Sequence, residues 1–160
     1  MTLFPSAKPI PTTATGAYLL QFDGGSRGNP GPGGIGVTLK DPSGKTVYEL
    51  AEHLGHCTSN VAEYTALVRG LEAAVALGVQ KLTIRADSEL VVRQLNGMYK
   101  VKSPALRPLY LRATALLARL HDAKITHVYR ESNSRADALA NLAMDRESKI
   151  EPLGPLPHKP

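Results

Sequence analysis

Four acidic residues stand at positions where folding would bring their side chains into or beside the protein interior. Asp23 and Asp87 each end an apolar run, Glu63 lies on the apolar stripe of a helical segment, and Asp137 falls in the first turns of the last helical segment. Carboxylates that converge at low dielectric repel one another, so some would keep their protons unless a cation offsets the charge. Mg²⁺ takes oxygen ligands and suits such a set. With one cysteine, Cys57, and no histidine pair at ligand spacing, zinc is disfavoured.

Three of these acids also have a structural interpretation. Glu63 is the fourth residue of the segment 60–63, Asn-Val-Ala-Glu, which fits a helix capping box. Asp87 fits the cap of the helix that follows it, and Asp137 would complement the dipole of its own helix. Asp23 precedes a Gly-Gly pair and has no obvious capping task. The residues alone leave these alternatives open.

Periodicity and turn residues predict the elements that must position the acids. Strands are expected at 18–24, 34–40, 46–53, 80–86 and 124–129, and helices at 60–77, 88–96, 109–122 and from Asn133 or Ser134 onward. Pro104 and Pro108 are expected to break the chain before the third helix. This order predicts an α/β fold with a five-stranded mixed sheet flanked by helices, whose ligands gather at the carboxyl ends of strands.

The 160 residues are enough for one domain with a sizeable core. We expect a flexible lead at 1–16, a folded domain at 17–146 and a Pro-rich, disordered tail at 147–160. No apolar run approaches the roughly 18 residues of a membrane span, and the first fifteen residues lack the apolar core of a signal peptide. A single cysteine rules out a disulfide framework within the chain and fits a reducing cytoplasm.

Positive charge is concentrated in one part of the chain. The net charge is +5, and residues 91–130 hold eight basic residues against one acid, Asp122. Such an asymmetry favours a polyanionic partner, nucleic acid first, although a solvated helix face would give the same pattern.

Four segments together resemble the signatures of type 1 ribonuclease H. They are DGGSRGNPGPGG at 23–34, TSNVAE at 58–63, ADS at 86–88 and NSRADALA at 133–140. They follow one another in the family's order, and the resemblance runs from Tyr18 to Met144. It implies a ribonuclease H-like fold and a type 1 ribonuclease H activity.

The resemblance also implies a chemistry for the four acids. In that family the equivalent positions bind two Mg²⁺ ions, for which Mn²⁺ is a possible substitute, and Asp23 would bridge both. Glu63, Asp87 and Asp137 would complete the two sites. The implied reaction is hydrolysis of the RNA strand of an RNA–DNA hybrid, giving 5′-phosphate and 3′-hydroxyl ends, with no covalent nucleophile.

A second group of residues would bind the hybrid. Glycine backbone can approach RNA closely, and telling a hybrid from DNA requires contact with 2′-hydroxyls in a wide minor groove. The expected contacts are Gly24, Gly25 and Ser26 by their backbone, Asn29, Asn60 and Glu89 near the groove, Thr58 at a DNA phosphate, and Lys100 and Lys102 at phosphates, with Arg107 beside them. Turn and cap chemistry is the alternative for the asparagines.

The chain departs from many relatives in two ways. It has no histidine in the short loop before Asp137, and His127 is expected to pack within its strand rather than to catalyse. It also has no tryptophan-containing basic handle. We expect a monomer that needs no small-molecule cofactor and no membrane. The alternatives are a DNA nuclease of the same fold, resembling integrases or resolvases, and a non-catalytic hybrid-binding module; a nucleotide-binding P-loop is disfavoured because the Lys-Ser/Thr ending is missing.

Overall fold

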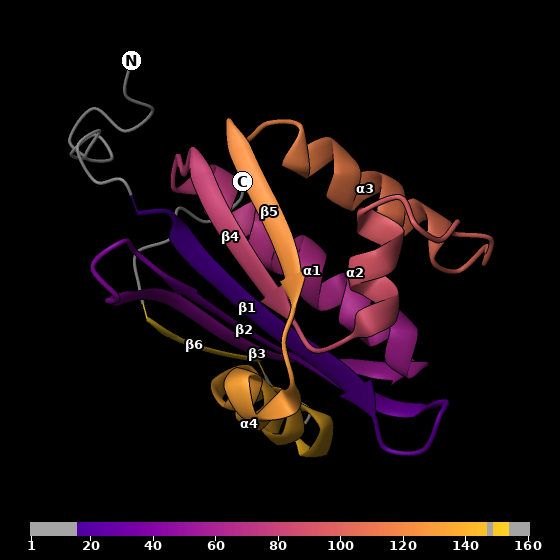
Figure 1. The fold of residues 1–160 in the computed structure, drawn as a ribbon. Coiled ribbons are helices and arrows are strands. Elements are labelled where there is room, and N and C mark those ends of the chain that lie inside the picture. Colours follow the sequence, from indigo (N-terminus) through magenta and orange to yellow (C-terminus); the bar gives the residue numbers. More distant parts are fainter. Residues whose placement is uncertain (1–15, 147–148, 154–160) are drawn as a thin grey trace.

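A mixed sheet forms the centre of the molecule (Figure 1). The computed structural model describes residues 16–146 and 149–153. The strands are β1 (Tyr18–Ser26), β2 (Gly31–Lys40), β3 (Thr46–Cys57), β4 (Lys81–Ala86), β5 (Asp122–His127) and β6 (Lys149–Leu153). Their order is β5-β4-β1-β2-β3-β6. Strands β1, β2, β3 and β6 pair antiparallel, whereas β4 and β5 extend the sheet from β1 in parallel.

Helices cover both faces of this sheet. They are α1 (Ser59–Ala76), α2 (Glu89–Leu95), α3 (Arg107–Leu117) and α4 (Ser134–Asp145), with a 3-10 turn at Arg130–Asn133. Helix α1 packs on β1 and β2, and α3 packs against α1. Helix α4 packs on the other face of the sheet, against β1, β2 and β3 (Figure 1). Among the described residues, no helix is both long and apolar enough to cross a bilayer.

The strand alternation of β1 and β2 explains these two layers. Leu20 and Phe22 are fully buried and stand opposite Leu39 and Val37 of β2, so all four point towards α1. On the other face, a Cβ added at Gly36 would lie 2.2 Å from the backbone oxygen of Ala136. A glycine is therefore required there for α4 to approach the sheet closely.

The α/β class and all five predicted strands are confirmed, with three corrections. Helix α3 begins at Arg107, because Pro108 is tolerated in the first turn of a helix, where its missing N–H needs no partner, and it ends at Leu117 rather than at residue 122, which is already in β5. Strand β5 begins and ends two residues earlier than expected. The prediction of a disordered tail is wrong for 149–153, where backbone pairing with β3 adds a sixth strand. The rest of that tail and residues 1–15 of the expected lead lie outside the described residues.

Candidate active site

The parallel register of β1 and β4 brings the first two acids together. Phe22 stands opposite Ala86 at the last pair of the β1–β4 ladder, so Asp23, within β1, and Asp87, directly after β4, lie side by side. Asp23 is only 8% exposed, and its Oδ1 accepts a hydrogen bond from the backbone N–H of Gly24 at 3.0 Å. This is the sheet edge where the sequence predicts a site.

Helix α1 brings Glu63 to the same place because Gly24 lets it come close. A Cβ added at Gly24 would lie 2.4 Å from the carbonyl carbon of Ala62, one residue before Glu63. One carboxylate oxygen from each of Asp23, Glu63 and Asp87 lies within 4.8 Å of the other two. Gly24 itself is buried and packs against α1, and the predicted contact of its backbone with RNA stays a prediction.

Asp137 joins this triad from the opposite layer. It lies in the first turn of α4, is half-buried, and its carboxyl group is near enough to that of Asp23 to raise the pKa of Asp23. The start of α4 is held on the sheet by Arg135, whose guanidinium donates to both carboxylate oxygens of Glu49 at 2.7 and 2.8 Å. The four acids thus converge from β1, α1, β4 and α4.

Electrostatics at this point disfavour four ionised carboxylates. Burial, followed by the charges of Asp87 and Asp137, raises the pKa of Asp23 to about 7. Burial and the charges of Asp23 and Asp87 raise the pKa of Glu63 well above its ordinary value, opposed weakly by Arg130. Within the described part of the chain, the solvent-shielded Oε1 of Glu63 meets no hydrogen-bond donor. An all-oxygen set with an unpartnered buried oxygen fits a hard divalent cation.

The helix caps exclude two of the structural alternatives. The N-cap of α1 is Thr58, whose hydroxyl accepts from the backbone N–H of Val61 at 3.2 Å, so Glu63 is not part of a capping box. The N-cap of α2 is Ser88, not Asp87. Asp137 does sit where it complements the α4 dipole, in addition to its effect on the pKa of Asp23.

Several expected substrate contacts form a polar rim beside the acids. Asn29 accepts from the backbone N–H of Ser59 at 3.1 Å, and the Ser26 and Ser59 hydroxyls lie 3.2 Å apart. The loop after β1 therefore rests on the N-terminus of α1, next to Thr58 and Asn60. The side chains of Asn29, Thr58 and Asn60 are exposed, and Gly25 is half-buried against Met144.

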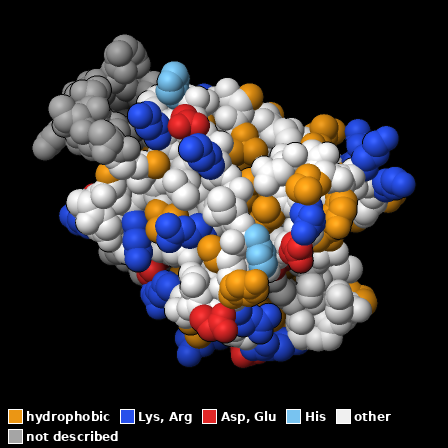
Figure 2. Space-filling view, viewed as in Figure 1, with side chains coloured by type: hydrophobic (Ala, Val, Ile, Leu, Met, Phe, Trp, Pro, Cys, Tyr) orange, Lys and Arg blue, Asp and Glu red, His pale blue; other side chains and the backbone are white. Residues whose placement is uncertain are grey.

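The remaining predicted contacts lie on α2 and the loop that follows it. Glu89 is exposed and forms an ion pair with Arg93 at 2.6 Å. Lys100 and Lys102 are exposed and line a shallow hollow together with Arg107 and the tyrosines at 99 and 110. Basic side chains gather over this loop in Figure 2.

Comparisons with known proteins show what this chain is similar to. A family model described as reverse transcriptase-like matches residues 21–143. Ribonuclease HI of Halobacterium salinarum is 48% identical over 124 residues, which make up 78% of this chain and 62% of that protein. The solved N-terminal RNase H domain of Rv2228c from Mycobacterium tuberculosis has a TM-score of 0.79 at 42% identity, covering 82% of this chain and 95% of that one. LC11-RNase H1, solved in complex with an RNA/DNA hybrid, has a TM-score of 0.75 at 41% identity, covering 80% and 96%.

The chain belongs to the type 1 ribonuclease H family. It spans 62% of the length of the Halobacterium ribonuclease HI and 35% of the bifunctional mycobacterial protein Rv2228c.

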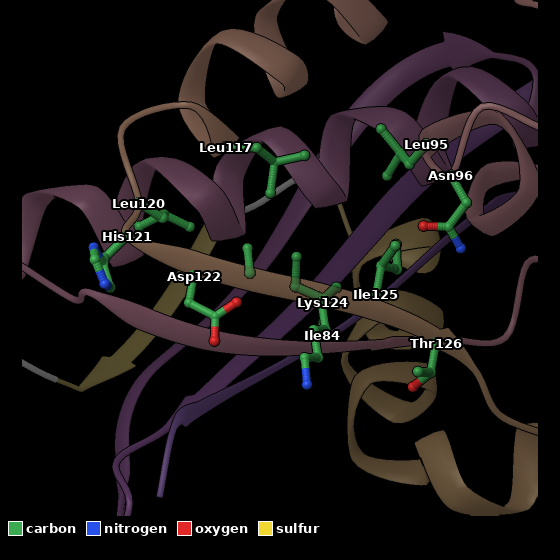
Figure 3. A pocket seen from close by; sticks show the side chains of 11 residues that line it. Ile84, Leu95, Asn96, Leu117, Leu120, His121, Asp122, Lys124, Ile125 and Thr126 are labelled. Atoms are coloured by element: carbon green, nitrogen blue, oxygen red, sulfur yellow. The ribbon is translucent and has the colours of Figure 1, made fainter. Parts of the chain in front are cut away.

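In this member of the ribonuclease H family, one prediction about a histidine is wrong. His127 is exposed at the end of β5, with its ring edge-on to that of Tyr129 at 5.4 Å, because the strand ends at this residue and lies at the free edge of the sheet. Figure 3 shows a hollow along the same edge, between β5 and helices α2 and α3. None of the four acids lines it.

We predicted no role in the site for Asn133, which lies in the family's fourth signature. Its side-chain amide is buried and donates to Asp87. The sequence indicated only that a helix starts near Asn133, and an asparagine at a helix start is equally typical of an ordinary N-cap.

Proposed function

We propose that this chain is a metal-dependent endoribonuclease that hydrolyses the RNA strand of RNA–DNA hybrids, leaving 5′-phosphate and 3′-hydroxyl ends. One observation carries the proposal: three carboxylates lie within 4.8 Å of one another, and the shielded Oε1 of Glu63 is unpartnered among the described residues. Membership of the ribonuclease H family and the similarity to LC11-RNase H1, which was solved with a hybrid, support the substrate.

The four acids would hold two Mg²⁺ ions, with Mn²⁺ able to substitute. Asp23 would be the ligand shared by both ions, since it belongs to the cluster with Glu63 and Asp87 and its pKa is also raised by Asp137. Bound divalent cations would activate the attacking water and offset the negative charge that develops on the leaving 3′ oxygen. The fold would hold the acids in place, because one lies within β1, one directly follows β4, and two project from packed helices.

The polar rim would bind the hybrid through its minor groove. The side chains of Asn29 and Asn60, with the backbone at Gly25 and Ser26, are suited to 2′-hydroxyls and base edges, and Thr58 to a phosphate of the DNA strand. Lys100 and Lys102 would bind backbone phosphates without reading sequence. Glu89 is the weakest member of this group, because its carboxylate is already paired with Arg93.

We extend the proposal to a monomer that works in the cytoplasm without a small-molecule cofactor. The single cysteine supports the reducing compartment.

A substrate panel tests the proposed function. Hybrid, duplex DNA and duplex RNA, each end-labelled, are incubated with the protein in MgCl₂ and in EDTA. Cutting of only the RNA strand of the hybrid, and only with the metal, is the expected result. The matched variants are Asp87→Asn, which should abolish cutting, and Asp122→Asn, an exposed acid on β5, which should not.

Two other outcomes would replace the proposal. Cutting of duplex DNA would indicate a DNA nuclease of the same fold. Hybrid binding with ordinary salt dependence, but no cutting in Mg²⁺ or Mn²⁺, would indicate a binding module.

A further inference from the structure

Asn133 lies at a junction of three elements that carry the site. Its side chain is 1% exposed, at the end of the 3-10 turn that leads into α4. Its Nδ2 donates to the backbone oxygen of Phe22 at 2.8 Å and to Oδ2 of Asp87 at 2.9 Å. Its Oδ1 accepts a hydrogen bond from Nε2 of Gln21 at 3.1 Å. This amide, four residues before Asp137, therefore contacts β1 directly before Asp23 and the carboxylate that directly follows β4.

Only a primary amide can make this set of contacts. The two N–H bonds of Nδ2 serve two acceptors, and the amide oxygen serves one donor. An aspartate would have no N–H to donate, and a serine has a single donor on a shorter side chain. The Gln21 amide supports the arrangement from outside, because its Nε2 also donates to the backbone oxygen of Ser132 at 2.7 Å.

The neutral charge of this donor matters for a cation site. A lysine or arginine at this position would pair with Asp87 and compete with a divalent cation for its charge. An amide instead fixes one carboxylate oxygen by a hydrogen bond and leaves the negative charge on the group. Outer hydrogen bonds of this kind orient the carboxylates that bind metals.

We infer that Asn133 is a positioning residue, which orients the Asp87 carboxylate in the acid cluster through its hydrogen bond to Oδ2, and which ties the start of α4 to β1. The inference rests on the proposed metal-dependent function. It predicts that losing the amide weakens divalent-cation binding more than it weakens hybrid binding or the fold.

A metal titration without substrate tests this inference. The melting temperature of the parent, Asn133→Ala and Asn133→Ser is followed as MgCl₂ or MnCl₂ is added to metal-free protein. We expect the concentration that gives half of the stabilisation to rise about tenfold for Asn133→Ala, within the range known for outer hydrogen-bond partners, and less for Asn133→Ser. In cleavage assays kcat at low Mg²⁺ should fall and recover at high Mg²⁺, with KM for the hybrid unchanged.

Val79→Ala is the matched control, because Val79 is buried in the core away from the acids. It should lower the melting temperature and leave the metal midpoint unchanged. If Asn133→Ala behaves like this control, Asn133 is merely structural and the inference is overturned. If the parent itself shows neither metal stabilisation nor cleavage, the proposed function fails instead.

A measurement on the parent covers the case in which the variants do not fold. The side-chain NH₂ protons of Asn133 should exchange slowly with water, and their NMR signals should shift when MgCl₂ is added. Fast exchange of these protons with water, or NMR signals that do not shift when MgCl₂ is added, would overturn the inference.

Discussion

Replacing Asp23 by asparagine should stabilise the metal-free protein at neutral pH while abolishing its activity. Asparagine has the same shape, and its Oδ1 can still accept the hydrogen bond from Gly24. Asparagine cannot ionise, however. It therefore avoids the free-energy cost of a buried negative charge beside Asp87 and Asp137, which is the cost that raises the pKa of Asp23. The variant therefore separates the cost of the carboxylate from its use.

The size of this effect follows from the pKa of Asp23. A carboxyl group whose pKa is raised from 3.8 to about 7 on folding disfavours the folded state by about 4 kcal/mol once it is ionised in both states. The unfolded chain binds fewer protons than the folded one between these values, so stability falls as pH rises from about 4 to 7. The Asp23→Asn variant should not show this decrease in stability. Compared with the parent, its melting temperature should be higher by on the order of 10 °C at pH 8 and nearly unchanged at pH 4.

Thermal unfolding in EDTA at pH 4 and pH 8 measures the effect. The control is Asp145→Asn, an exposed carboxylate whose pKa is lowered by its ion pair with Arg27. That variant should be slightly less stable than the parent at pH 8, the opposite sign. If Asp23→Asn is no more stable than the parent at pH 8, the carboxylates do not repel one another and the electrostatic argument for a cation site is refuted.

Three further substitutions test the supports of the site. Gly24→Ala should cost about 1–3 kcal/mol and abolish stabilisation by Mg²⁺, because its Cβ would push the α1 backbone away; urea unfolding with normal metal response would contradict this. Arg135→Ala should cost about 1–2 kcal/mol at pH 7 by leaving Glu49 unpaired, and the loss should vanish on acidification, because Arg135 holds the pKa of Glu49 low; a pH-independent loss would count against it. Tyr64→Phe should cost about 1–2 kcal/mol in urea unfolding, since its hydroxyl donates to buried Gln94 at 2.6 Å; an unchanged midpoint would show the bond to be dispensable.

The parts of the site that depend on strand ends could be predicted from the sequence. Asp23 and Asp87 each follow an apolar run, and neighbouring parallel strands end at one edge, so their proximity follows from pattern alone. Glu63 sits four residues before Leu67 on the buried side of α1, which places it towards the sheet. The family resemblance then linked Asp137 to these three, which spacing alone could not do.

Contacts between distant elements could not be predicted. The amide of Asn133 meets Asp87 only because the 3-10 turn folds back under β1, and nothing in the local sequence separates this from a helix cap. Gly24 is expected at the end of a strand, but nothing in the local sequence shows that the α1 backbone occupies the space its Cβ would need. The strand at 149–153 depends on the free edge of β3, which no pattern in a Pro-rich segment reveals.

The cleavage rate of a hybrid labelled on its RNA strand, measured in MgCl₂ for the parent, Asp23→Asn and Asp137→Asn, tests the central claim most directly. Circular dichroism and melting temperature must first establish that each variant is folded. The parent should cut the hybrid and neither variant should cut above background, since both acids would hold metal. Variants that cut the hybrid as fast as the parent would contradict it.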